Sequence, residues 1–273
     1  MRYCSVASGS SGNCHFIEAG GVRVLVDAGL SLKTLESNLI SRGIAPQSIQ
    51  ALFVTHEHSD HVKSVGAWAR RYQIPVFATE GTWYGMERCL GKMRPEKCYS
   101  IRSGQGYRMD GLRVEPFLIY HDANEPVGYS FTTEEEKLVV MTDTGMVSSE
   151  MRDMLRGARI AVVECNHDID MLMGGSYPLS LKRRIRSNLG HLSNEDCGHL
   201  LAELIPDNPE CDYLLAHLSQ ENNTPETAMG TVREILQRRL GEGDYRLHMT
   251  RRDLPTQVFE TQEEPCTGTS IRI

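Results

Sequence analysis

Apolar and polar positions alternate along the chain in blocks whose lengths distinguish strands from helices. Short continuous apolar runs are typical of buried strands, and longer amphipathic stretches are typical of helices. The pattern predicts helices at residues 31–42, 62–71, 80–90, 193–204 and 225–240, and no clear element after Pro255. It predicts strands at residues 1–6, 15–18, 22–27, 51–54, 75–78, 113–120, 127–131, 138–142, 160–164, 213–216 and 245–249.

Strands and helices that follow one another in this way indicate an α/β fold. Local chemistry marks several helix starts, because Ser31, Ser193 and Thr224 are suitable N-caps and Pro225 suits a first helical turn. The chain has no internal repeats and no low-complexity segments. We therefore predict a single domain that covers residues 1–273.

One loop concentrates side chains that can bind metal ions. Residues 55–61 (THEHSDH) lie between a predicted strand and a predicted helix, where α/β folds place their chemistry. His56 and His58 are two positions apart, so both side chains leave the same side of an extended segment and can bind one ion. Asp60 and His61 follow the bend and can reach a second ion. Histidine and aspartate together suit zinc, manganese or iron.

Three further candidate ligands follow predicted strands. His121 comes after the strand 113–120, and Asp143 and His217 come directly after later ones. A single histidine at a strand end is more often structural, and Asp143 is also compatible with a plain Asp-Thr-Gly turn. His121 gains weight because the cluster at 55–61 could take a third ligand for its first ion, and Asp143 and His217 gain theirs from the family resemblance described below.

Composition narrows the class of protein. The 273-residue chain is 40% hydrophobic and 24% charged, as is typical of soluble globular proteins. It has no run of about 18 apolar residues that would predict a membrane span, and its amino terminus lacks the apolar core of a signal peptide. The eight cysteines form no C-x-x-C pair and are expected to be reduced thiols, which predicts a cytoplasmic location.

Charge bears on the choice of substrate. The formal net charge of the chain is −7, which gives no overall attraction to nucleic acid. However, residues 182–186 (KRRIR) contain four cations in five positions. This run is compatible with a solvated helix face and equally with contacts to the phosphates of a substrate.

The motif HxHxDH after a strand resembles the signature of the metallo-β-lactamase superfamily, and residues 55–61 match it throughout. The resemblance implies an α/β four-layer αβ/βα sandwich, in which two mixed sheets are flanked by helices. It also implies two divalent metal ions, Zn, Mn or Fe, and hydrolysis of an ester, amide or phosphodiester. The implied ligands are His56, His58 and His121 for one ion, Asp60, His61 and His217 for the other, and Asp143 as a bridge.

Other residues take their expected roles from the same resemblance. Asp27 would hold the metal loop in place by hydrogen bonds, and His167 and Asp168 would support the site or orient the substrate. The expected catalytic residues are Asp60, Asp143 and His191, of which His191 would assist the leaving oxygen. The residues expected to contact substrate are Ser10, Asn13, Lys182, Arg183, Arg184, Arg186 and Ser219.

The sequence around His121 distinguishes branches of the superfamily. Residues 120–122 (YHD) stand where β-lactamases and glyoxalase-like thioesterases usually have Pro-Gly-His-Thr, which favours the phosphodiesterase and nuclease branches. With the turn 8–13 (SGSSGN) and the segments 191–196 and 217–223, the chain resembles the WalJ/YycJ-type branch. That resemblance implies a manganese-supported 5′-to-3′ exonuclease that acts on DNA.

Two alternatives remain open. The same metal site could hydrolyse RNA ends or a small cyclic or nucleotide phosphodiester, and the acidic net charge counts against DNA. The other alternative is a metal-binding scaffold without turnover. The sequence predicts no membrane contact and gives no basis for an obligate protein partner.

Overall fold

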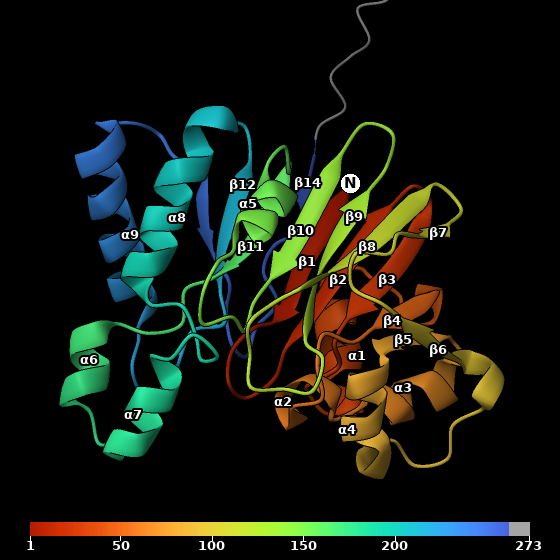
Figure 1. Ribbon diagram of the computed structural model, residues 1–273. Helices are drawn as coiled ribbons and strands as arrows, with labels where there is room; N and C mark the ends of the chain where they lie inside the picture. Colours follow the sequence, from red (N-terminus) through yellow and green to blue (C-terminus); the bar gives the residue numbers. More distant parts are fainter. Residues whose placement is uncertain (262–273) are drawn as a thin grey trace, which may run out of the picture.

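The computed structural model describes residues 1–261 of the chain. Two seven-stranded sheets pack face to face, and helices cover the outer face of each sheet (Figure 1). Both sheets are mixed, because each contains parallel and antiparallel pairs. The predicted four-layer αβ/βα sandwich is therefore confirmed. The end of the predicted domain, residues 262–273, lies outside the described part of the chain.

The first sheet has the strand order β14-β1-β2-β3-β4-β5-β6. The pairs from β14 to β3 are antiparallel, and those from β3 to β6 are parallel. Gly20 and Gly21 form the two-residue turn between β2 and β3, and both have positive φ, as a tight hairpin of this kind requires. The strands are β1 (Arg2–Ala7), β2 (Cys14–Ala19), β3 (Val22–Val26), β4 (Ala51–Phe53), β5 (Val76–Thr79), β6 (Cys98–Ile101) and β14 (Phe259–Glu260).

The second sheet has the order β13-β12-β11-β10-β9-β8-β7. Its pairs from β13 to β10 are parallel, and those from β10 to β7 are antiparallel. The parallel strands are nearly all apolar, because both of their faces are covered. The strands are β7 (Tyr107–Met109), β8 (Leu112–Leu118), β9 (Val127–Thr132), β10 (Lys137–Met141), β11 (Ile160–Glu164), β12 (Asp212–Ala216) and β13 (Leu247–Met249).

Helices begin where the sequence supplies a cap. The hydroxyls of Ser31, Ser193 and Thr224 accept backbone N–H bonds from the first turns of α1, α8 and α9. None of the helices within residues 1–261 combines the length and the apolar character needed to cross a membrane. The helices are α1 (Leu32–Ser41), α2 (Ser59–Val62), α3 (Val65–Tyr72), α4 (Glu80–Leu90), α5 (Ser149–Leu155), α6 (Ile169–Gly174), α7 (Leu179–Ile185), α8 (Asn194–Leu204) and α9 (Pro225–Leu240), with 3₁₀ turns at Pro46–Ser48, Pro95–Lys97 and Ile205–Asp207.

The structure corrects the predicted elements in three respects. The predicted helix 62–71 is two helices, α2 and α3, separated at Ser64, whose N–H bonds to the carbonyl of Ala28 outside either helix. Strand β14 lies beyond Pro255, where the pattern predicts nothing, and it forms by pairing with β1. The pattern also does not predict β6, β7, α5, α6 and α7, which are too short for a clear period.

Three apolar clusters hold the layers together. The central cluster, between the sheets, includes Phe53 and Phe131, whose ring centroids lie 6.0 Å apart in an edge-to-face contact. A second cluster packs α5, α8 and α9 against the second sheet, and a third packs α1, α3 and α4 against the first. Burial of a large apolar side chain contributes roughly 1.5–3 kcal/mol, so these interfaces fix the two sheets relative to each other.

The carboxyl ends of parallel strands from both sheets meet at one edge of the sandwich, the lower edge in Figure 1. Asp27 follows β3, and the segment 55–61 follows β4 in the first sheet. Asp143 and His217 come after β10 and β12 in the second. Polar residues that are far apart in the sequence are thus brought together at this edge.

Candidate metal centre

His56 and His58 belong to the segment between β4 and α2. β4 ends at Phe53, and α2 begins at Ser59. His56 is fully buried, and its ring centroid lies 4.6 Å from that of His58. Both rings lie 4.9 Å from the ring of His121, centroid to centroid. The two histidines therefore face the same third residue.

His121 completes a first set of possible ligands. It does not end a strand, because β8 stops at Leu118 and His121 lies in the turn before β9. Its Nε2 is 3.2 Å from Nδ1 of His58. One ring nitrogen from each of His56, His58 and His121 lies within 4.8 Å of the others, a spacing at which one ion can bind all three.

Asp60, His61 and His217 form a second set. Asp60 and His61 lie in α2, and His217 directly follows β12 in the other sheet. Oδ2 of Asp60 is 3.4 Å from Nε2 of His61 and 3.8 Å from Nε2 of His217. One ligand atom from each residue lies within 4.8 Å of the others, so both sheets contribute to this set.

Asp143 lies between the two sets. Its Oδ2 is 3.5 Å from Nε2 of His61, and its Oδ1 is 4.0 Å from Nε2 of His121. Oδ1 also lies 3.3 Å from Nδ1 of His217, so the carboxylate as a whole faces members of both sets. Burial would raise the pKa of Asp143, but His217 and His61 hold that pKa well below its usual value, so the carboxylate is ionised and could serve as a ligand.

Three buried polar atoms in the cluster have no hydrogen-bond partner within residues 1–261: Nε2 of His56, Oδ2 of Asp143 and Nε2 of His217. Such an atom costs roughly 1–3 kcal/mol, and native proteins contain few of them. All three carry a lone pair that a divalent cation would satisfy. The residues present therefore fit metal ions, and their imidazole and carboxylate chemistry suits Zn, Mn or Fe.

Asp27 holds the loop that carries these residues. Its carboxylate accepts hydrogen bonds of 2.8 Å from the N–H and the hydroxyl of Thr55 and lies 2.8 Å from Nδ1 of His61. The contact at Nδ1 leaves Nε2 of His61 to face Asp60 and Asp143. Burial would lower the pKa of His61, but Asp143, Asp60 and Asp27 raise it well above its usual value. This position therefore favours positive charge.

The backbone is unusual at three points of the site. Asp27, Asp143 and His217 have φ of 63°, 59° and 57°, respectively. Residues other than glycine seldom adopt this left-handed region, and they do so mainly where the surroundings enforce it. Asp27 and His217 directly follow β3 and β12, and Asp143 comes two residues after the end of β10. The left-handed turn at each position directs the side chain into the cluster and the chain away from the sheet.

Glu164 is a residue of the site that sequence reasoning does not single out. It ends β11, is fully buried, and lies 2.8 Å from Nδ1 of His191 and 2.9 Å from Nδ1 of His217. It also accepts N–H bonds from Thr144 and Leu192. Burial would raise the pKa of Glu164, but the two histidine rings lower it to about 2. The available signal was a glutamate at the end of an otherwise apolar strand.

His191 lies at the rim of the cluster. Its backbone N–H bonds to the carbonyl of Ile185, and its ring centroid is 5.0 Å from that of His121. The side chain is 19% exposed, whereas His56, His61 and His217 are buried. Because Nδ1 is engaged by Glu164, Nε2 is the ring atom left to meet a substrate.

The turn 8–13 joins the site from the first sheet. Nδ2 of Asn13 lies 3.2 Å from Oδ2 of Asp60 and 3.0 Å from Nε2 of His61. The hydroxyl of Ser8 accepts the backbone N–H of His217 at 2.9 Å, which ties the turn to the second sheet. Ser10 and Ser219, also expected to contact substrate, both line a small cavity beside His191.

Two residues named from the sequence lie outside both ligand sets. The side chain of Asp168 caps α6 by accepting the N–H of Met171 at 2.8 Å. His167 is buried, and its Nδ1 has no hydrogen-bond partner in the described structure. Burial lowers the pKa of His167 to about 4, which keeps the ring neutral. Neither residue belongs to the groups that could hold an ion.

The basic run 182–186 covers the end of α7 and the residue after it, and its side chains lie in different environments. Lys182 is buried, and its Nζ donates to the carbonyls of Met173 at 2.8 Å and Gly175 at 2.7 Å. It therefore does not present its charge to a substrate, contrary to the expectation from the sequence. Nε of Arg184 pairs with Asp122, and Arg183 and Arg186 are exposed.

Comparison with known proteins places this fold and site in a family. Residues 22–208 match the family described as β-lactamase superfamily domain. The chain belongs to this superfamily, and its metallo-β-lactamase fold and histidine–carboxylate cluster make it a metal-dependent hydrolase. The resemblance noted in the sequence is thereby confirmed.

Individual relatives extend over nearly the whole chain. The chain is 39% identical over 260 residues to exodeoxyribonuclease YycJ of Bacillus anthracis, covering 94% of this chain and 98% of that protein. It is also 39% identical over 264 residues to exodeoxyribonuclease WalJ of Streptococcus pneumoniae, covering 95% and 98%, respectively. The metallo-β-lactamase fold protein YhfI of Bacillus subtilis superposes with a TM-score of 0.68 at 16% identity, over 95% of this chain and all of that structure, which shows a shared fold.

Proposed function

We propose that the protein is a binuclear metal-dependent phosphodiesterase, and specifically an exonuclease that degrades DNA in the 5′-to-3′ direction. The observation that carries the proposal is the pair of ligand sets on either side of the ionised Asp143. Support for DNA comes from the two exodeoxyribonucleases, each 39% identical over almost their full lengths.

The residues divide between two ions in this proposal. His56, His58 and His121 would hold one ion and Asp60, His61 and His217 the other, with Asp143 reaching both. When bound, the ions would polarise the phosphoryl oxygens and lower the pKa of an attacking water. Manganese is the ion that we expect to support activity, although the ligands also suit zinc and iron.

The chain supplies proton transfer through His191. Glu164 lies 2.8 Å from Nδ1 of this ring, which fixes the orientation of the imidazole and leaves Nε2 free to face a substrate. Nε2 can then donate a proton to the oxygen that leaves the phosphorus, which is general acid catalysis. Asp60 would orient the attacking water, because its Oδ2 is held at 3.2 Å by Asn13 at the edge of the second set.

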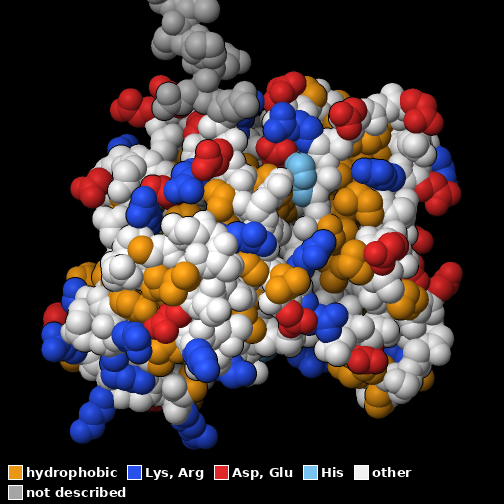
Figure 2. All heavy atoms as spheres, turned by 180° about the vertical axis from the view of Figure 1, so that it is seen from behind, with side chains coloured by type: hydrophobic (Ala, Val, Ile, Leu, Met, Phe, Trp, Pro, Cys, Tyr) orange, Lys and Arg blue, Asp and Glu red, His pale blue; other side chains and the backbone are white. Residues whose placement is uncertain are grey.

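Exposed cations would hold the DNA backbone next to the site. Lys and Arg side chains gather at the lower left of Figure 2, which is the side of α3 and α4 in Figure 1, at the same lower edge as the ligand sets. On the other side of this edge, Arg183 on α7 and Arg186 directly after it are also exposed. Phosphate contacts of this kind weaken as salt is added, and they offset the net charge of −7 locally.

A nuclease assay tests the proposal. End-labelled duplex DNA is incubated with wild type and with His58→Ala, with and without manganese. We expect manganese-dependent shortening from the 5′ end that His58→Ala abolishes. The matched control is His199→Ala, which removes an exposed histidine from α8 and should leave cleavage unchanged. Shortening from the 3′ end, or equal cleavage by His58→Ala, would contradict the proposal.

A second candidate is hydrolysis of an RNA end or a small phosphodiester at the same metal centre. The observation that favours it is the modest size of the cavity beside His191, about 190 Å³. Turnover of bis(p-nitrophenyl) phosphate by wild type, with no cleavage of DNA, would select this candidate over the exonuclease.

Two further features belong to the proposal. We propose a cytoplasmic location, because the seven cysteines in the described part of the chain are free thiols and five of them are buried. We also propose one domain, because β14 near the end of the described chain pairs with β1 at its start.

A further inference from the structure

A cavity of about 190 Å³ adjoins the metal centre on the side of α7. It is smaller than the roughly 300–1,000 Å³ of sites for drug-sized ligands, so it suits a single ring-sized group. His191 lines the cavity, and its Nδ1 contacts Glu164 at the metal centre. A chemical group bound in the cavity would therefore lie next to a group bound at the two ligand sets.

Part of the lining of the cavity is apolar and aromatic. Leu181 and Ile185 lie four residues apart on α7, hence on the same face of the helix, and both line the cavity together with Tyr177. Aromatic and apolar side chains of this kind form platforms on which the flat face of a nucleobase stacks, whatever its identity.

The lining of the cavity also contains polar groups. Nδ2 of Asn166 donates to the carbonyl of His217 at 2.8 Å, which orients the amide and leaves its oxygen as an acceptor for a ligand. Nε of Arg184 is bound to Asp122, so the terminal nitrogens of the guanidinium remain as donors. These acceptor and donor groups suit the polar edge of a nucleobase, and the apolar residues suit its flat face.

The wall formed by α7 is held in place. Nζ of Lys182 bonds to the carbonyls of Met173 and Gly175, which ties α7 to the end of α6. Gly190 packs so closely that a Cβ there would lie 2.1 Å from the carbonyl oxygen of Ile185. The cavity therefore exists before any ligand binds, which reduces the entropic cost of binding.

We propose that this cavity binds the base of the terminal nucleotide of the DNA strand, next to the phosphodiester that is cut. The inference rests on the proposed exonuclease function. A cavity that accepts one base, beside a metal centre that accepts one phosphodiester, limits each cut to a single nucleotide. Mononucleotides are then the expected product.

Filling the cavity tests the inference. Binding of thymidine 5′-monophosphate to the manganese-loaded protein is measured by titration calorimetry for wild type and Leu181→Trp. We expect Leu181→Trp to weaken binding at least about tenfold. The matched control is Leu179→Trp, which adds the same side chain to α7 at a residue that is 54% exposed and does not line the cavity; it should bind as wild type does.

A second pair of variants tests the inference even if Leu181→Trp does not fold. Tyr177→Phe keeps the stacking surface, and Tyr177→Ala removes it. We expect near-wild-type binding for the first and about tenfold weaker binding for the second. Failure of wild type to bind the nucleotide, or equal affinities for wild type, Tyr177→Ala and folded Leu181→Trp, would overturn the inference.

The same proteins distinguish this inference from the proposed function. Wild type that binds the nucleotide through the cavity but cuts no DNA would contradict the exonuclease and retain the base site. Wild type that cuts DNA to mononucleotides, with Leu181→Trp cutting and binding equally well, would retain the exonuclease and reject the base site.

Discussion

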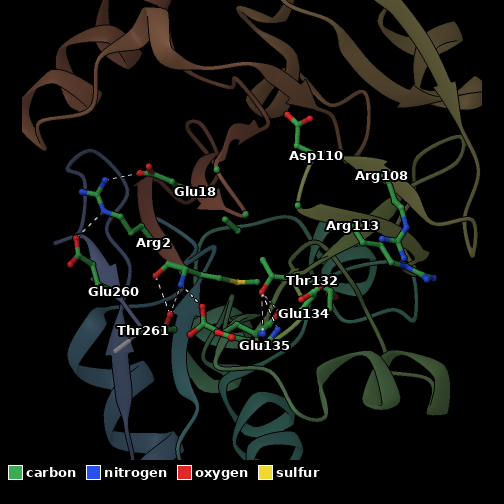
Figure 3. A pocket seen from close by; sticks show the side chains of 17 residues that line it. Arg2, Glu18, Arg108, Asp110, Arg113, Thr132, Glu134, Glu135, Glu260 and Thr261 are labelled. Carbon is green, nitrogen blue, oxygen red and sulfur yellow. Dashed lines mark hydrogen bonds and ion pairs between the residues drawn. The ribbon is translucent and has the colours of Figure 1, made fainter. Parts of the chain in front are cut away.

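The two ends of the sandwich both carry clustered charge and a cavity, yet they differ in chemistry. At the end opposite the metal centre, a cavity of about 1110 Å³ opens between strand starts and hairpin turns (Figure 3). At the metal centre, the cavity is about 190 Å³. Volume alone would therefore direct attention to the wrong end.

Pairing and burial explain the difference. At the opposite end, Arg2 lies between Glu18 at 2.6 Å and Glu260 at 2.8 Å (Figure 3), and its side chain is 37% exposed. Such exposed pairs contribute little. At the metal centre, Asp143 and His217 are only 3% exposed and keep buried atoms without hydrogen-bond partners. Buried polar atoms without hydrogen-bond partners, and not the larger cavity volume, therefore indicate the end where an ion can bind.

The sharpest test of this contrast replaces one aspartate at each end. Asp143→Asn should lower DNA cleavage by about 10³-fold or more, since metal ions contribute several kcal/mol to the transition state, and it should lower the bound metal. Asp110→Asn at the opposite end should change neither. Both aspartates have positive φ, 59° and 47°, a region that asparagine also tolerates, so the pair isolates the chemistry from the backbone.

Bound metal is measured by elemental analysis of the dialysed proteins, and cleavage is measured on end-labelled duplex DNA. Equal losses in Asp143→Asn and Asp110→Asn would mean that the contrast between the two ends is wrong.

Glu164→Gln has the second-largest expected effect. Glutamine keeps the shape of the side chain but removes the charge that Nδ1 of His191 and Nδ1 of His217 face. Losing a partner that orients a metal ligand typically costs about 10–100-fold in metal affinity or activity. We expect a loss in this range, measured as manganese affinity by calorimetry and as the rate of DNA cleavage.

The matched control for this change is Glu18→Gln at the opposite end, where the carboxylate likewise serves two partners, Arg2 and Arg23. It should leave metal affinity and cleavage unaltered. A wild-type metal affinity and rate for Glu164→Gln would show that the buried carboxylate does not orient the histidines.

Much of the fold and the positions of the ligands could be predicted because they depend on local patterns. Apolar runs with abrupt polar ends located β4, β10 and β12, and caps such as Ser193 located the helices. The histidines of residues 55–61 stand together in the sequence, so their clustering needs no knowledge of tertiary contacts.

Other features could not be predicted because they depend on tertiary contacts. Glu164 belongs to an apolar strand, and only the approach of His191 and His217 gives its carboxylate a role. Lys182 lies in a basic run that is typical of an exposed helix face, and only the carbonyls at the end of α6 explain its burial. Strand β14 forms through pairing with β1, and its two residues are too few to show a strand pattern in the sequence.

The smallest expected effect lies at the start of β12, again away from the metal centre. The carboxylate of Asp212 accepts bonds from Nη2 of Arg246 at 2.6 Å and lies 2.7 Å from Nε2 of His248. Burial would raise the pKa of Asp212, but His248 and Arg246 lower it. A lowered pKa in the folded protein means that the group stabilises the fold above its unfolded pKa of about 3.9, and that this contribution is lost as the pH falls through the folded pKa.

Asp212→Asn should therefore lower the free energy of unfolding by about 1 kcal/mol at pH 7, or about 2–4 °C in Tm for a protein of this size. The deficit relative to wild type should begin to shrink as the pH falls below about 4, and it should be smallest below the folded pKa of Asp212, where both proteins lack the charge. Thermal unfolding of the metal-free proteins across this range gives the measurement, and subtracting wild type removes the effect of the histidine cluster. A deficit that stays constant down to pH 3 would mean that shape, not charge, accounts for it. Unchanged DNA cleavage at pH 7 would keep the two ends functionally separate.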